Sequence, residues 1–172
     1  MSNPLLRIEN LNIAFGETQV VHSLSLTINA GETLAIVGES GSGKSVSALG
    51  MVNLLPSNAA IQGERWLGDT NLASLSEAQW IGVRGNRVGF IFQEPMTSLN
   101  PLHRVGKQIG EALRLHQGLR GHAARQRSKE LLEQVKLPRA DELLEAWPHQ
   151  LSGGQRQRVM IAMAIANNPS LL

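Results

Sequence analysis

The 172-residue chain contains no cysteine, so it can form neither a disulfide nor a metal site with thiolate ligands. It has no run approaching the roughly 20 consecutive apolar residues that a membrane-spanning helix needs. Its first residues lack the basic segment and the apolar stretch of a secretory signal. These absences predict a chain that stays in the cytosol and is stabilised by a hydrophobic core.

The chain also carries little net charge. The formal charge is only +2, the arginines are scattered, and basic and aromatic residues do not alternate as they do in single-strand binders. We therefore expect no nucleic-acid partner.

A glycine-rich loop is the clearest chemical motif. The β-favouring residues Leu34–Val37 precede it and predict a buried strand, and a helix is expected from about Gly43 to Leu54. The spacing G-x-x-x-x-G-K-[ST] lets backbone N–H groups surround a phosphate, adds an ammonium group, and supplies a hydroxyl that suits Mg²⁺. A flexible Gly/Ser loop with a chance lysine is the alternative. The residues predicted to bind nucleotide phosphates are Gly38, Glu39, Ser40, Gly41, Ser42, Gly43, Lys44 and Ser45.

A second motif, Leu151-Ser152-Gly153-Gly154-Gln155, opens an apolar helix. Its serine and glutamine form a capping box, which would suffice to start a helix. Two glycines in the first turn nevertheless cost roughly 0.5–1 kcal/mol each relative to alanine, and Arg156 and Arg158 place cations where the helix dipole prefers acids. Both features would be explained by an anion bound at this helix start.

The remaining patterns outline the fold. Residues 5–28 alternate as an antiparallel β-layer, and residues 61–67 and 87–92 predict further strands, the latter ending in Gln93. Residues 105–144 show helical spacing. Phe15 precedes the phosphate loop, so it is either a core aromatic or a ring that stacks on a nucleotide base.

The two motifs, in this order and with Gln93 between them, resemble the nucleotide-binding subunit of an ABC transporter over essentially the whole chain. Residues 90–101 and 148–164 resemble the oligopeptide, dipeptide and nickel importer branch, and residues 102–103 and 113–118 are similar to the microcin C importer ATPase. The resemblance implies an α/β P-loop NTPase core with an N-terminal antiparallel β-layer and an inserted helical subdomain.

The resemblance also implies domain limits, cofactors and roles. The β-layer and P-loop half would span 1–94, the helical insertion 95–150, and the signature motif with its helix 151–172. ATP and Mg²⁺ would be the cofactors, with Phe15 stacking on adenine, Lys44 and Gln93 acting in catalysis, and Ser45 and Gln93 binding the metal. The γ-phosphate of ATP on a second subunit would contact Ser152, Gly153, Gly154 and Gln155.

Partners and location follow from the same resemblance. We expect transmembrane permease subunits, which would contact the helical insertion, and a second ABC ATPase domain in a homo- or heterodimer. A periplasmic or extracellular solute-binding protein would take part indirectly. The expected location is cytoplasmic, peripheral on the inner face of the cell membrane.

The sequence departs from the family pattern after Leu172, where the family continues into an apolar strand that ends in an Asp-Glu pair and later supplies a histidine. The resemblance therefore predicts an amino-terminal fragment of the ATP-binding subunit of a peptide-type ABC importer. The alternative is a non-hydrolysing nucleotide-binding or regulatory fragment. The sequence leaves open whether this chain itself is an enzyme.

Overall fold

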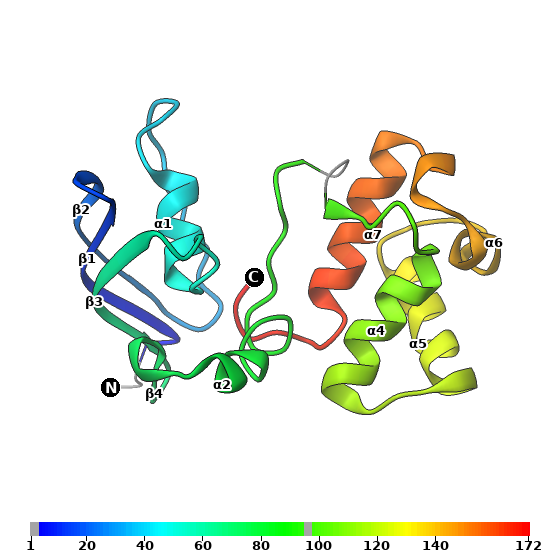
Figure 1. The fold of residues 1–172 in the computed structure, drawn as a ribbon. Helices are drawn as coiled ribbons and strands as arrows, with labels where there is room; N and C mark the ends of the chain where they lie inside the picture. The colour runs from blue at the N-terminus through cyan, green and yellow to red at the C-terminus, as the bar shows by residue number, and fades with distance from the viewer. Residues whose placement is uncertain (1–3, 95–97) are drawn as a thin grey trace. The chain divides into compact units, whose positions relative to one another are not determined.

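The computed structural model describes residues 4–94 and 98–172, and the chain divides into two compact units, Met1–Gln79 and Trp80–Leu172 (Figure 1). The domain limits expected at 94/95 and 150/151 stay a prediction. Residues 95–97, where the helical insertion was expected to begin, lie outside the described residues.

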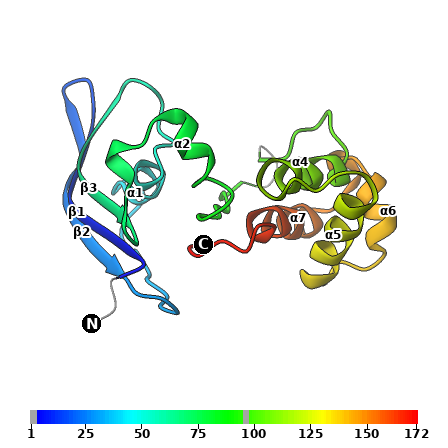
Figure 2. The same cartoon turned by 90° about the horizontal axis from the view of Figure 1, so that it is seen from below.

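The first unit is built on an antiparallel sheet with the strand order β2-β1-β3-β4. This sheet confirms the antiparallel β-layer expected for residues 5–28. Side chains on β1 alternate between the core and the other face of the sheet, as period-2 patterning requires, so that Leu6 and Ile8 are buried in its first half and Leu11 and Ile13 in its second. The strands are β1 (Leu6–Phe15), β2 (Thr18–Ile28), β3 (Ala59–Leu67) and β4 (Thr70–Asn71), and their sheet is seen from a second side in Figure 2.

A bulge bends β1 in the middle of this sheet. The pairs Glu9–Glu64 and Asn12–Gln62 leave Asn10 and Leu11 opposite the single residue Gly63. A Cβ atom at Gly63 would lie 2.5 Å from the Asn10 carbonyl oxygen, and the φ angle of Gly63 is 106°. Only glycine fits there, so the bulge accounts for a glycine inside a strand.

Helix α1 (Lys44–Met51) packs on this sheet at close range. A Cβ atom at Gly50 would lie 2.4 Å from Cδ1 of Ile13, so the absent side chain lets the helix approach β1. Arg65 of β3 is buried and donates from Nη1 to the Gly50 carbonyl oxygen at 2.7 Å. Burial lowers the pKa of this guanidinium, and its contact with the last helical turn is favourable for the helix dipole.

The second unit is mainly helical. Four helices pack around one apolar cluster that includes Val105, Ile109, Leu131 and Val159, which confirms the helical pattern expected over residues 105–144. The helices are α4 (Val105–Gln117), α5 (Gly121–Gln134), α6 (Ala140–Glu145) and α7 (Gly153–Ile165), with the short α2 (Glu77–Ile81) at the border between the units and the 3₁₀ turns η1 (Leu72–Ser74) and η2 (Pro148–Gln150).

Polar contacts tie these helices to their loops. Buried Gln108 of α4 donates from its amide to the carbonyl oxygens of Asn100 and His103 and accepts from the Asn100 N–H. On the surface, the Glu145 carboxylate pairs with both Arg104 and Arg125, and these cations lower the pKa of Glu145. Among the described residues, no helix is both long and apolar enough to cross a membrane.

Two predicted strands are wrong wholly or in part. Leu34–Val37 forms no strand, and its apolar side chains are exposed, Val37 to 90%. Over residues 87–92 only Val88 pairs, through isolated parallel bridges to Arg84 and Leu171. A strand needs a neighbour to satisfy its backbone groups, and the described residues provide none beside Leu34–Val37 or residues 90–92.

Two glycines one turn apart on α4 give a matched test of this packing. A Cβ atom at Gly106 would lie 2.9 Å from the Leu144 carbonyl oxygen, whereas one at Gly110 would meet no atom within 4 Å. We expect Gly106→Ala to destabilise the helical unit by about 1–3 kcal/mol through overpacking. We expect Gly110→Ala to stabilise it by about 0.5–1 kcal/mol through helix propensity. Urea unfolding followed by circular dichroism measures the free energy of unfolding of both variants. If both substitutions change it in the same direction, the assigned packing of α4 against Leu144 is wrong.

Candidate functional site

The loop before α1 closes around the ammonium group of Lys44. Its Nζ donates to the carbonyl oxygens of Gly38 at 2.7 Å and Glu39 at 2.6 Å, and it lies 3.3 Å from Oγ of Ser42. The Ser42 N–H in turn donates to the Glu39 carbonyl oxygen at 3.2 Å. The structure therefore brings four of the predicted phosphate-binding residues into one small ring around a cation.

Close approaches explain the glycines of this loop. A Cβ atom at Gly38 would lie 2.7 Å from Oγ of Ser42, and one at Gly43 would lie 2.9 Å from the Val20 carbonyl oxygen of β2. Gly41 and Gly43 also have φ angles of 83° and 85°, which glycine adopts without strain. The glycines of the sequence pattern therefore stand at positions where the backbone of the loop requires glycine.

The ring lies at the amino end of α1, where helix geometry favours an anion. Gly43 is the N-cap, no side chain caps the first turn, and that turn contains no acidic residue. The first N–H groups of any α-helix have no intrahelical acceptor, and here no side chain caps them, while the helix dipole adds partial positive charge. The exposed Ser45 supplies a hydroxyl in the same turn. Glu39, Ser40 and Gly41 are exposed as well.

The other predicted site residues lie elsewhere. Phe15 ends β1 in the same unit, is half-buried, and pairs with Thr18 and Ala59. Gln93 belongs to the second unit, where it lies exposed in a bend. Its amide oxygen and the Ser45 hydroxyl are both hard oxygen ligands of the type that Mg²⁺ accepts. The motif at 151–155 also belongs to the second unit.

The capping box predicted at the start of α7 is present. The Ser152 N–H donates to Oε1 of Gln155 at 2.9 Å, and the Gln155 N–H donates to Oγ of Ser152 at 3.3 Å. Cβ atoms at Gly153 and Gly154 would meet no atom within 4 Å. Packing therefore does not require these two glycines, and the backbone of this helix start is open to a close approach.

Arg156 and Arg158 require a different interpretation from the one the sequence suggested. Nε of Arg156 donates to the Pro148 carbonyl oxygen at 2.7 Å. Nη1 of Arg158 donates to the carbonyl oxygens of Val135 at 3.0 Å and Lys136 at 3.1 Å. These contacts explain both arginines without an anion, so the glycine pair alone supports an anion site at this helix.

Sequence reasoning missed Arg65, the buried cation that holds the carboxyl end of α1, and the two α4 glycines Gly106 and Gly110. Nothing local in the sequence distinguishes Arg65, because its role depends on packing between β3 and α1. The α4 glycines did carry a signal, since glycine inside a helical pattern costs about 1 kcal/mol relative to alanine and calls for an explanation.

The capping box gives a direct stability test. We expect Ser152→Ala to lower the free energy of unfolding by about 1 kcal/mol, because the Gln155 N–H loses its acceptor. Ser152→Asp is the matched control, since aspartate caps equally well and suits the helix dipole. Urea unfolding compares the two variants. Equal stability of the alanine variant and the wild-type chain would show that the box contributes nothing.

Comparisons with known proteins agree with this geometry. The sequence model of the family described as ABC transporter matches residues 21–172. The chain is 51% identical to the peptidoglycan transport ATP-binding protein YejF of Agrobacterium fabrum, covering 99% of this chain and 32% of that protein. It is 49% identical to the glutathione import ATP-binding protein GsiA of Escherichia coli O157:H7, covering 98% and 29%. The chain thus spans about a third of the length of the curated relatives it matches.

Solved structures show the same fold. The dimeric bacterial ABC transporter cassette MJ0796 superimposes with a TM-score of 0.80 at 30% identity, covering 95% of this chain and 70% of that one. A post-hydrolysis state of the same cassette, bound to ADP and Pi, matches with a TM-score of 0.80 at 31% identity. The described residues therefore have the α/β fold of part of an ABC ATPase cassette.

Proposed function

Because the chain belongs to the ABC transporter family, we propose that it forms part of the ATP-binding subunit of an importer for peptides or related solutes. In this role it couples ATP binding and hydrolysis to transport. The observation that carries the proposal is the ring of loop oxygens around Lys44 at the uncapped start of α1. The names of the relatives, which describe peptidoglycan transport and glutathione import, support the peptide branch.

ATP is the proposed ligand of this ring. The loop amides and the first turn of α1 bind the phosphates, and Lys44 exchanges its carbonyl acceptors for phosphate oxygens. Phe15 stacks on the adenine ring. Ser45 and Gln93 hold Mg²⁺, which when bound neutralises charge on the phosphates, and Gln93 also positions the attacking water.

The start of α7 has a second role in this proposal. Gly153 and Gly154 leave its backbone open, and Ser152 and Gln155 hold the helix start in place, so this end can contact the γ-phosphate of ATP on a second ABC ATPase domain. The dimeric state of the related cassette supports such a pairing. Permease subunits, and through them a solute-binding protein, complete the proposed importer. The subunit then lies on the inner face of the membrane.

Substitution of Lys44 tests the central claim. We expect Lys44→Ala to weaken the affinity for a fluorescent ATP analogue by about tenfold or more, because a methyl group cannot offset phosphate charge. Lys129→Ala is the matched control, since Lys129 pairs with Asp141 among the helices. Titration of both variants in the presence of Mg²⁺ is the measurement. Equal ATP affinities of the two variants would show that this loop is not part of the ATP-binding site.

Substitution of Gly154 separates the two anion sites. We expect Gly154→Asp to leave the affinity for ATP unchanged but to prevent the ATP-dependent dimer, because the new carboxylate repels the incoming γ-phosphate. Gly154→Ala is the control, since a methyl group at this position meets no atom within 4 Å. ATP affinity by titration and dimerisation by light scattering are measured separately. Loss of ATP binding with intact dimerisation would contradict the proposed role of this helix start.

A further inference from the structure

The antiparallel sheet of the first unit contains a buried cation. Arg65 of β3 is 6% exposed, and among the residues that the structure describes it is the only ionisable side chain that is buried. It pairs with Ile8 of β1, which is also buried, so the two side chains share the core face of the sheet. The fold therefore places a permanent positive charge among apolar side chains.

No carboxylate compensates this charge within the part of the chain that the structure describes. Arg65 forms no ion pair there, and its Nε atom is buried without a hydrogen-bond partner. Glu9 pairs with Arg7, and Glu64 accepts from the Trp66 indole N–H at 3.0 Å. Burial lowers the pKa of the Arg65 guanidinium, and no neighbouring charge opposes this shift. An unpaired buried charge lowers the stability of a fold, so stability does not explain an arginine at this position.

The polar contact of Arg65 is with the last turn of α1. Its Nη1 donates to the Gly50 carbonyl oxygen at 2.7 Å. The same carbonyl oxygen also accepts from the backbone N–H of Val52 and, at 3.3 Å, from that of Asn53. The helix end would thus keep hydrogen-bond partners without Arg65. Capping of the helix therefore does not explain the buried cation either.

The hydrogen bond from Arg65 fixes α1 along its own axis. Two glycines let the helix lie close to the sheet, Gly43 against the Val20 carbonyl oxygen and Gly50 against a side chain of β1. These steric contacts limit the approach of the helix, whereas a hydrogen bond depends on both distance and direction and so resists sliding. Lys44 lies six residues before Gly50, about 9 Å along the helix axis, so a shift at one end of α1 moves the other end.

We propose that Arg65 is a positioning residue of the nucleotide site, which the chain carries at a cost in stability. Through the Gly50 carbonyl oxygen it holds α1 where the first helical turn and the Lys44 ammonium group meet the phosphates of ATP. This inference rests on the proposed function, which supplies ATP as the ligand. Its distinguishing consequence is that removal of Arg65 lowers the affinity for ATP without weakening the sheet.

Arg65→Met in the full-length protein tests the proposal, because methionine has a long apolar side chain and no donor. We expect the affinity for a fluorescent ATP analogue to fall by about tenfold or more, since α1 leaves its position. Hydrogen exchange of the β3 amides, residues 59–67, is measured on the same samples. We expect equal or slower exchange, because the unpaired buried charge is gone. A residue with only a structural role would give the reverse, faster exchange with unchanged affinity.

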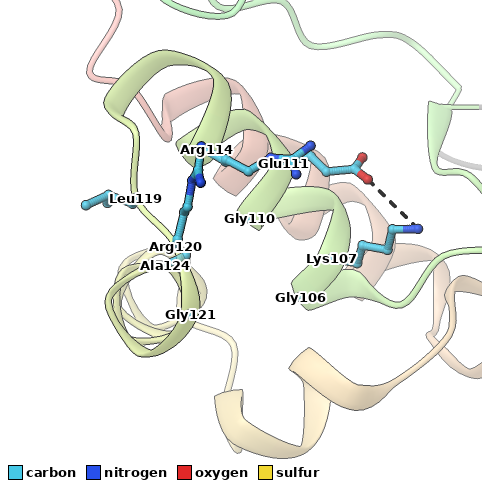
Figure 3. A pocket seen from close by; sticks show the side chains of 9 residues that line it. All are labelled: Gly106, Lys107, Gly110, Glu111, Arg114, Leu119, Arg120, Gly121 and Ala124. Carbon is cyan, nitrogen blue, oxygen red and sulfur yellow. Dashed lines mark ion pairs between the residues drawn. The ribbon is translucent and has the colours of Figure 1, made fainter.

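Two further substitutions are matched controls. Arg65→Lys keeps a charge and a donor for the single bond to Gly50, so we expect it to retain the affinity for ATP within about threefold. Arg114→Met removes an exposed arginine of α4 that borders a pocket of the helical unit (Figure 3). This second control should leave the affinity for ATP unchanged.

Gly50→Ala provides an independent arm, because it displaces the same end of α1 while Arg65 is present. The added Cβ atom would lie 2.4 Å from Cδ1 of Ile13, so the helix end has to move away from the sheet. We expect the affinity for ATP to fall. Arg65→Met should cause little additional loss in this background, because both substitutions act through the same displacement.

Three results would overturn the positioning role: wild-type ATP affinity in Arg65→Met, faster exchange of the β3 amides in that variant, or its failure to fold. Lys44→Ala, measured alongside, distinguishes this failure from failure of the proposed function. If Lys44→Ala loses affinity while Arg65→Met retains it, only the positioning role is wrong. If both variants bind ATP as the wild-type protein does, the proposed function is wrong as well.

Discussion

The ammonium group of Lys44 is the centre on which the candidate site depends. A lysine carries three donors and no acceptor, so it orders whatever oxygen atoms surround it. Here those atoms are the carbonyl oxygens of Gly38 and Glu39, with the Ser42 hydroxyl close by, and their convergence on one cation fixes the curl of the loop. In the proposed function, a phosphate that enters this ring would exchange one set of acceptors for another. The site therefore does not have to desolvate a free lysine when the ligand binds.

The position of the ring depends in turn on α1, a helix of eight residues that is too short to be stable alone. The sheet holds this helix at both ends. At its start Gly43 lies against the Val20 carbonyl, and at its other end Gly50 contacts Ile13 while Arg65 binds the Gly50 carbonyl oxygen. Two glycines and one buried cation thus fix the helix dipole relative to the loop. The antiparallel layer contributes to the site through this placement.

Sequence reasoning succeeds where the interacting residues are close together in the sequence, and it fails where they lie on distant segments. The curl of the glycine-rich loop around Lys44, the capping box at Ser152 and the helices over 105–144 are specified by residues a few positions apart, and the structure contains each of them. Arg65 could not be assigned in this way, because its partner on α1 is 15 residues distant and depends on how helix and sheet pack. The same limit explains Arg156 and Arg158, whose carbonyl partners lie on other segments.

The incorrect strand at Leu34–Val37 illustrates the limit of composition as evidence. Its residues favour β structure, but propensity only describes how well a residue fits a pleated surface that already has neighbours. Parallel pairing is present where a neighbour exists: the Gly89 N–H donates to the Leu171 carbonyl oxygen at 2.8 Å, and the Leu171 N–H donates to the Arg87 carbonyl oxygen at 3.1 Å. A few residues further on, Phe92 has no such neighbour among the described residues and is 45% exposed. Burial of an apolar segment in this fold therefore follows from pairing, and a hydrophobic pattern predicts a strand only together with its partner.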